Sequence, residues 1–176
     1  MGRDKALIRP DRSGPTFAEC AALVLEDAGL HPVHLVGRQR ALQALSIPVL
    51  RDPVGAGHHP LFGFATALAD AAHRGARFAI LVPCDVPALR TETVIALARC
   101  SGAAVAECDG QIQPMFALVP VDWGPAALEA AHAGWSARRF LDRPDVARVR
   151  LAAPALSDID TPDDFAKWMR RRTRGQ

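Results

Sequence analysis

Residues 78–87 read FAILVPCDVP, and this stretch does most to indicate the fold. Its first five residues form a continuous apolar run, which is typical of a strand buried on both faces of a parallel sheet. The run ends at Pro83, and the acidic residue that follows, Asp85, lies between this proline and Pro87. The pattern therefore predicts a strand buried on both faces that ends in a stiff turn carrying a carboxylate.

Helical and strand-like segments alternate on both sides of this run. Strands separated by helices of about ten to fifteen residues are typical of an α/β fold with a mostly parallel sheet. No repeat and no linker interrupts the pattern, so we expect one domain over residues 1–176. The expected helices are 16–29, 38–45 (weak), 61–75, 91–100 with Thr91 as N-cap, 125–134, 137–142 and 160–172; the expected strands are 32–37, 47–50, 78–82, 103–107, 114–119 and 147–151.

The composition is that of an ordinary globular protein, with 49% hydrophobic and 23% charged residues and a formal net charge of +2. No apolar run approaches the roughly 18–20 residues that span a bilayer, so we expect a cytoplasmic protein with no membrane partner. Five basic residues lie in the last ten positions. We interpret them as a solvated helix end and expect no nucleic-acid partner. The four cysteines lack metal-site spacing, which indicates small buried side chains in a reducing compartment.

Asp85 is the first candidate for chemistry. Ligands of open α/β sheets bind beyond the carboxyl ends of the strands, where this residue falls. A carboxylate held there is suited to bind Mg²⁺ together with substrate phosphates. An aspartate in such a turn also commonly satisfies backbone donors, and the residues alone favour neither interpretation. Asp158 and Asp160 near the C-terminus also have two interpretations, a metal ligand or a structural role in a helix cap.

The opening residues, MGRDKALI, place Arg3 and Lys5 beside Gly2. Cations next to a glycine are a common way of holding phosphates. A second glycine-rich loop, GAGHHPLFG (55–63), would let the backbone approach a nucleotide base closely. Arg138 and Arg139 are either surface charges or contacts for an anionic substrate.

Five segments, taken in order, resemble the molybdenum cofactor guanylyltransferases: MGRDKALI, HPLFG, PCDVP, QPMFALV and DIDTPDDF. The resemblance covers essentially the whole chain. It implies a three-layer, Rossmann-like nucleotidyltransferase fold, that is, a single MobA-like NTP transferase domain. The implied activity is the transfer of GMP from GTP to the terminal phosphate of molybdopterin, with release of pyrophosphate. The implied partners are these two substrates and, transiently, other enzymes of molybdenum cofactor synthesis or the target molybdoenzymes.

The resemblance also implies roles for particular residues. Lys5 would contact the GTP phosphates as a catalytic residue, Asp85 would hold a catalytic Mg²⁺, and Asp160 would assist in holding that metal. Gly2 and Arg3 would line the phosphate site. The residues implied at the guanine side are Asp52, Pro60, Leu61 and Gly63, and those implied at the molybdopterin side are Gln113, Pro114 and, for its phosphate, Arg138 or Arg139.

The sequence departs from the family pattern in three places. The family's first strand and the start of its glycine-rich loop would lie before Met1, so we expect an N-terminally incomplete domain that is poorly stable or inactive. His59 stands where the guanine loop usually has glycine. Asp160 stands where guanylyltransferases commonly have Asn, which leaves open the alternatives of CTP or another phosphorylated acceptor. A catalytically inactive nucleotide-binding or cofactor-binding chain is the remaining alternative.

Overall fold

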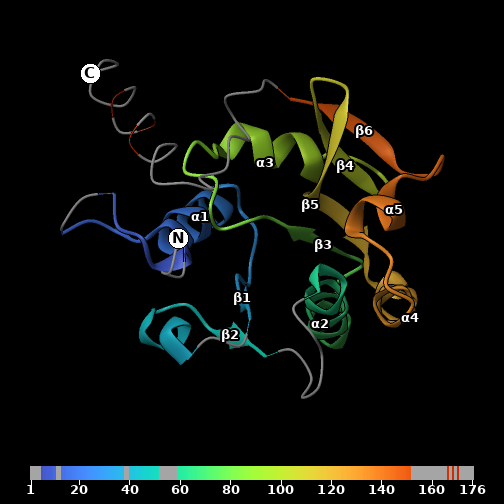
Figure 1. The fold of residues 1–176 in the computed structure, drawn as a ribbon, viewed down its shortest axis with the longest axis horizontal. Helices are drawn as coiled ribbons and strands as arrows, with labels where there is room; N and C mark the ends of the chain where they lie inside the picture. The colour runs from blue at the N-terminus through green and yellow to red at the C-terminus, as the bar shows by residue number, and fades with distance from the viewer. Residues whose placement is uncertain are drawn as a thin grey trace.

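The computed structural model of the protein describes residues 5–10, 13–37, 40–51 and 59–151, together with residues 166, 168 and 170. Helices lie on both sides of strands in this part of the chain (Figure 1). The helices are α1 (Phe17–Asp27), α2 (Pro60–His73), α3 (Thr91–Ala98), α4 (Gly124–His132) and α5 (Ala137–Leu141), with short 3-10 helices η1 (Lys5–Leu7), η2 (Arg40–Ala44) and η3 (Val121–Trp123). The strands are β1 (Leu35–Val36), β2 (Val49–Leu50), β3 (Phe78–Leu81), β4 (Ala104–Cys108), β5 (Gln111–Pro120) and β6 (Ala147–Arg150).

The larger sheet has the strand order β3-β5-β4-β6. β5 is antiparallel to both of its neighbours, whereas β4 and β6 are parallel. β4 and β5 are joined by Asp109 and Gly110, whose φ angles are 50° and 73°. Two consecutive residues in this left-handed region form the tight turn of a hairpin, so this turn is what reverses β5.

The smaller sheet contains β1 and β2 in parallel. Helix α2 runs antiparallel to β1. Near the start of the helix, a Cβ added to Gly63 would lie 3.6 Å from Cγ1 of Val36, which is in β1. Just past the end of the helix, Arg74 contacts His34, which precedes β1. The chain turns from α2 directly into β3, which packs against this helix. β3 therefore runs in the same direction as β1. Within the described residues only β5 runs the other way, and the expected α/β fold with a mostly parallel sheet is confirmed.

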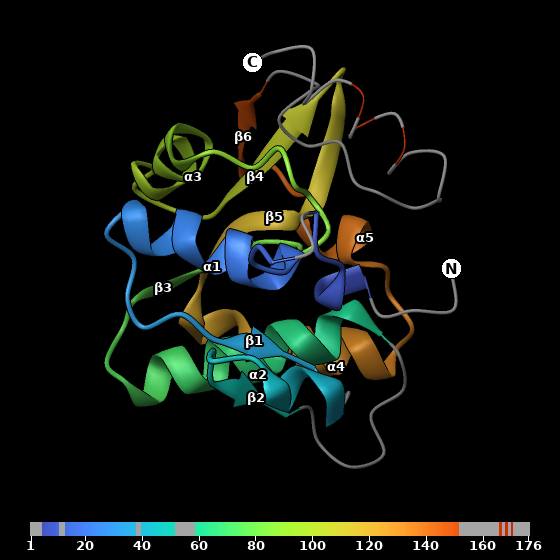
Figure 2. The ribbon, with the colours of Figure 1, turned by 90° about the vertical axis from the view of Figure 1, so that its left-hand side faces the viewer.

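The side chains of β3 alternate between two apolar clusters that cover opposite faces of the sheet. Ala79 and Leu81 pack with residues of α2, α4 and α5, and Phe78 and Ile80 pack with residues of α1 and α3. Figures 1 and 2 show the same arrangement of helices on the two sides. The helices and the sheet between them form the three layers implied by the resemblance.

Several local expectations are corrected. Thr91 is the first residue of α3 rather than its N-cap; Arg90 holds that position and makes no side-chain cap bond. The weak helix expected at 38–45 is the 3-10 helix η2. β3 is half-buried at all four positions, although its sequence is typical of full burial. The expected helix at 160–172 lies mostly outside the described residues. The three residues described in this range, 166, 168 and 170, are helical.

Two further expectations concern the whole chain. No helix in the described ranges is both long enough and apolar enough to cross a bilayer. The four cysteines, all of which are described, form no disulfide.

Helix α1 begins with a complete capping box. The Thr16 hydroxyl accepts a bond from the backbone N–H of Glu19 at 3.2 Å, and the Glu19 carboxylate accepts the backbone N–H of Thr16 at 2.7 Å. The bonds from the backbone and the hydroxyl of Thr16, and the nearby charge of Arg9, lower the pKa of Glu19. The box therefore stabilises the helix at neutral pH and is lost as the pH falls through that lowered pKa.

Thr16→Ala is expected to lower the free energy of unfolding by about 1 kcal/mol, because it removes one half of the box at a buried position. Urea denaturation at pH 7 measures the change. Thr16→Ser, which keeps the hydroxyl, serves as the control and should recover most of the loss. Equal losses in both variants would contradict the capping role.

Candidate active site

Lys5 and Asp85 form an ion pair although 80 positions separate them in the sequence. The Lys5 Nζ lies 3.4 Å from Oδ2 of Asp85. Their side chains keep 30% and 23% of their surface exposed, respectively. A cation and a carboxylate are thus held together within reach of solvent and of a ligand.

The packing beneath this pair explains its position. Ala6, next to Lys5, is buried with Ala18 and Leu42, and Cys84, next to Asp85, packs against the same cluster. On the other side of Asp85, Val86 is buried in the cluster formed with α1 and α3. The turn is therefore anchored on both sides of Asp85, in addition to the restriction from Pro83 and Pro87. Asp85 thus lies in a turn that follows β3, as the sequence predicts.

The pair lies just beyond the carboxyl end of β3, where ligands of α/β sheets bind. A cavity of about 840 Å³ runs between the two sheets, and Cys84, the residue before Asp85, is part of its lining. At this end the cavity is lined by His59, Pro60, Gly63, Pro83 and Cys84. The structure thus brings the predicted HPLFG loop and the PCDVP turn to one cavity.

The residues implied at the guanine side lie at the start of α2. His59 is the N-cap, and its Nδ1 accepts the backbone N–H of Leu61 at 3.3 Å. Leu61 has no exposed surface and packs in the apolar cluster that α2 shares with α4 and α5. Pro60 and Gly63 do line the cavity. Asp52 lies outside the described residues.

Three of the residues implied at the molybdopterin side, Gln113, Pro114 and Arg138, lie near the start of β5. The guanidinium of Arg138 donates to Oε1 of Gln111 at 2.9 Å and to the carbonyl of Ile112 at 3.1 Å. These partners immediately precede Gln113 and Pro114. Arg139 takes a different position, with its guanidinium 4.0 Å from the ring centre of Trp135. Of the two arginines, Arg138 is therefore the one associated with the predicted edge.

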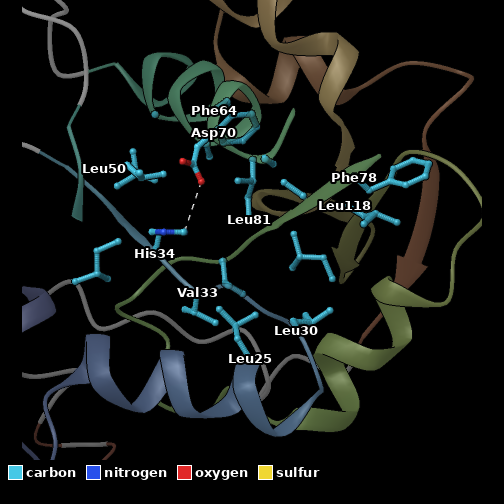
Figure 3. A pocket seen from close by; sticks show the side chains of 18 of the residues that line it. Leu25, Leu30, Val33, His34, Leu50, Phe64, Asp70, Phe78, Leu81 and Leu118 are labelled. Atoms are coloured by element: carbon cyan, nitrogen blue, oxygen red, sulfur yellow. Dashed lines mark ion pairs between the residues drawn. The ribbon is translucent and has the colours of Figure 1, made fainter. Parts of the chain in front are cut away.

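Sequence reasoning missed a polar cluster at the other end of the cavity, which Figure 3 shows in part. Asp70 accepts a hydrogen bond from Arg74 at 2.8 Å, and its Oδ2 lies 3.7 Å from Nδ1 of His34. The bond from Arg74 lowers the pKa of Asp70. The four-residue spacing of Asp70 and Arg74 on a helix is a signal for their pairing, but His34 could be placed only by the fold.

Asp85 suits an open magnesium site, which water and phosphates complete, better than a metal site closed by protein ligands alone. In the ranges that the structure describes, no group of three or more His, Cys, Asp or Glu side chains surrounds a common point. Mg²⁺ keeps several waters and often takes only one or two carboxylates plus substrate phosphates, and Asp85 meets that requirement. Gly2, Arg3 and Asp160 lie outside the described residues.

Comparison with known proteins gives the family. The MobA-like NTP transferase domain matches residues 1–149. A probable molybdenum cofactor guanylyltransferase of Opitutus terrae is 38% identical over 130 residues, covering 69% of this chain, and the chain spans 61% of that relative's length. A molybdenum cofactor guanylyltransferase of Yersinia pestis is 28% identical over 186 residues, covering 99% of this chain and 90% of the relative.

A solved structure supports the fold independently. The crystal structure of molybdopterin-guanine dinucleotide biosynthesis protein A from Archaeoglobus fulgidus superimposes with a TM-score of 0.71 at 19% identity, covering 98% of this chain and 92% of that one. The three-layer architecture and the match over residues 1–149 agree with each other and with the motifs in the sequence. This protein therefore belongs to the family of the MobA-like NTP transferase domain.

Proposed function

We propose that the protein transfers GMP from GTP to the terminal phosphate of molybdopterin, with release of pyrophosphate. The observation that carries the proposal is the Lys5–Asp85 pair, a cation and a carboxylate held together beyond the carboxyl end of β3, where ligands of α/β sheets bind. The names of the relatives from Opitutus terrae and Yersinia pestis support this choice of reaction.

Both substrates of this reaction carry phosphate charges, so the main requirement is to bring two anions together. Lys5 supplies a cation for the triphosphate, and its present partner, Asp85, keeps it directed toward the site. Asp85, with Asp160, would hold Mg²⁺, which when bound neutralises phosphate charge and orients the transferring group. The nucleophile is a phosphate that is already ionised at neutral pH, so the chain needs no strong base.

The acceptor would lie against the start of β5. Arg138 is fixed there by its bonds to Gln111 and Ile112, and a guanidinium held in this way is suited to bind a phosphate. Gln113 and Pro114 would contact the pterin, and Pro60 and Gly63 would border the base of the nucleotide. Arg139 would have to leave Trp135 to take part.

The test supplies one α-labelled nucleotide at a time. The protein is incubated with Mg²⁺, molybdopterin and labelled GTP, CTP, ATP or UTP. We expect label in the dinucleotide product only from GTP, and no product when the metal is chelated. Preferred transfer from CTP would assign cytidylyl transfer instead. Absence of transfer from all four nucleotides by a folded protein would contradict the proposal.

A further inference from the structure

The imidazole of His59 is held in place at the start of α2. Its Nδ1 accepts the backbone N–H of Leu61 at 3.3 Å, and its ring meets the ring of Phe62 nearly edge to face, with centroids 6.0 Å apart. Phe62 is buried and makes a second edge contact with His132 at 5.2 Å. The imidazole therefore rests on a buried aromatic side chain as well as on the helix. Capping alone would be served better by serine or aspartate.

The cap bond also fixes where the imidazole carries its proton. A ring nitrogen that accepts an N–H must present a lone pair, so in the neutral ring the proton lies on the other nitrogen. Nδ1 of His59 is thus an acceptor and Nε2 a donor. Within the described ranges no hydrogen bond uses Nε2, so this N–H is available to a ligand.

The backbone at the start of α2 is poorly suited to a phosphate. Helix N-termini bind phosphates through free backbone N–H groups. Here Pro60 has no N–H, that of Leu61 donates to the imidazole, and that of Phe62 donates to the carbonyl of His59 at 3.1 Å. The first three residues of the helix therefore leave no free N–H, and the donor that remains is the imidazole. This end of the site suits a neutral acceptor better than an anion.

His59 belongs to the same cavity as the turn that carries the candidate catalytic pair. Of the described residues that line the cavity at this end, only His59 has a side-chain N–H group. Cys84, which precedes Asp85, is part of the same lining. A nucleotide that holds its phosphates at Lys5 and Asp85 and its base in the cavity would therefore meet one fixed side-chain N–H, that of His59.

One fixed donor can distinguish guanine from two of the other bases. Guanine has an acceptor, O6, at the position where adenine and cytosine have an amino group. A donor directed at this position bonds to guanine and faces a second donor when the base is adenine or cytosine. Because Nδ1 is engaged by the helix, the neutral ring cannot exchange its donor for an acceptor. Uracil also has an acceptor at this position, so the contact alone does not exclude UTP.

We propose that His59 is a specificity-determining residue of this site, whose Nε2–H donates to O6 of guanine while its Nδ1 caps α2. The inference rests on the proposed transfer from GTP and adds a contact to it. A glycine, which the family pattern has at this position, could not supply that contact. The departure at His59 is therefore an additional means of recognising guanine.

Nucleotide binding tests this contact without turnover. Isothermal titration calorimetry compares GTP with the triphosphate of 2-aminopurine riboside, which lacks O6, on the unchanged protein and on His59→Ser. Serine keeps a hydroxyl cap on α2, so the variant should melt at the same temperature, but its side chain is too short to replace Nε2. Losing O6 should weaken binding about tenfold in the unchanged protein, as expected for one hydrogen bond, and less than about twofold in His59→Ser.

ITP is the matched control nucleotide, because it keeps O6 and lacks only the 2-amino group of guanine. Its affinity relative to GTP should be the same in both proteins. If removing O6 weakens binding equally in both proteins, His59 only caps the helix and the inference is wrong, even where the transfer assay with labelled GTP succeeds. A folded protein that transfers no label from GTP would overturn the inference together with the proposed function.

Nitrogen NMR of the imidazole rings gives a test that needs no nucleotide. The His59 signals are assigned as those missing from His59→Ser, and spectra are recorded in mildly alkaline buffer. We expect a protonated Nε2 and an unprotonated Nδ1, with the Nε2 signal shifting when GTP binds. A proton on Nδ1, or an Nε2 signal that GTP leaves unchanged, would contradict the inference.

Discussion

Asp85→Asn is expected to reduce nucleotidyl transfer by about 100–1,000-fold while leaving the protein folded. The substitution keeps the shape of the side chain but removes the charge that pairs with Lys5 and would hold the metal. Losing one preorganised charge contact at a reacting phosphate typically costs that much in rate. The pair is partly exposed, so its contribution to stability is only about 0–1 kcal/mol. Steady-state transfer assays and thermal melting, performed on the same preparations, measure the two effects separately.

Asp145→Asn is the matched control for this prediction. Asp145 also pairs with a cation, Arg143, at 2.7 Å, but it is 56% exposed and lies far along the chain from the PCDVP turn. We expect an unchanged transfer rate in this variant. Lys5→Met should resemble Asp85→Asn, and the double variant should lose less than the two single losses combined, because both side chains act on the same phosphates. A normal rate in Asp85→Asn would remove the basis of the proposed function.

Phe116→Ala is expected to lower the free energy of unfolding by about 3–5 kcal/mol. Phe116 is 1% exposed and packs in the cluster between the sheet and helices α1 and α3. Total stabilities of domains are about 5–15 kcal/mol, so the variant should be partly unfolded at 37 °C. Urea titration followed by circular dichroism measures the loss.

Leu23→Ala provides the comparison for this core substitution. Leu23 lies in α1 with 50% of its surface exposed, and its truncation should change stability by no more than about 0.5 kcal/mol. If the Phe116 variant were as stable as the Leu23 variant, the cluster would not form the core that the structure describes.

Local signals in the sequence predicted much of the fold. The helical spacing of apolar residues in 16–29 predicted α1, because amphipathic periodicity is a property of neighbouring residues. The Asp109-Gly110 pair is an equally local signal for a hairpin, and it would have predicted the reversal of β5. The prediction that Thr91 is the N-cap of α3 was wrong, because a hydroxyl residue near a helix start can equally occupy the first helical position.

The candidate site was predicted only in part. Asp85 was singled out by its two prolines and its place after an apolar run, and Lys5 by its glycine and arginine neighbours. Neither segment alone predicts that Lys5 and Asp85 are in contact across 80 positions. The contact depends on the packing of Ala6 and Cys84 in one cluster. The same limit applies to Arg138, whose partners on β5 lie 26 and 27 positions away.

Local patterns in the sequence were enough to predict most of the described helices and strands, and they show which residue types are available for phosphates and a metal. Which of these residues meet, and the half-burial of β3 beside a cavity, emerge only in the folded chain. The physical reason is the range of the forces involved. Propensity, capping and turn geometry act within a few residues, whereas strand pairing and burial depend on segments that only the folded chain brings together.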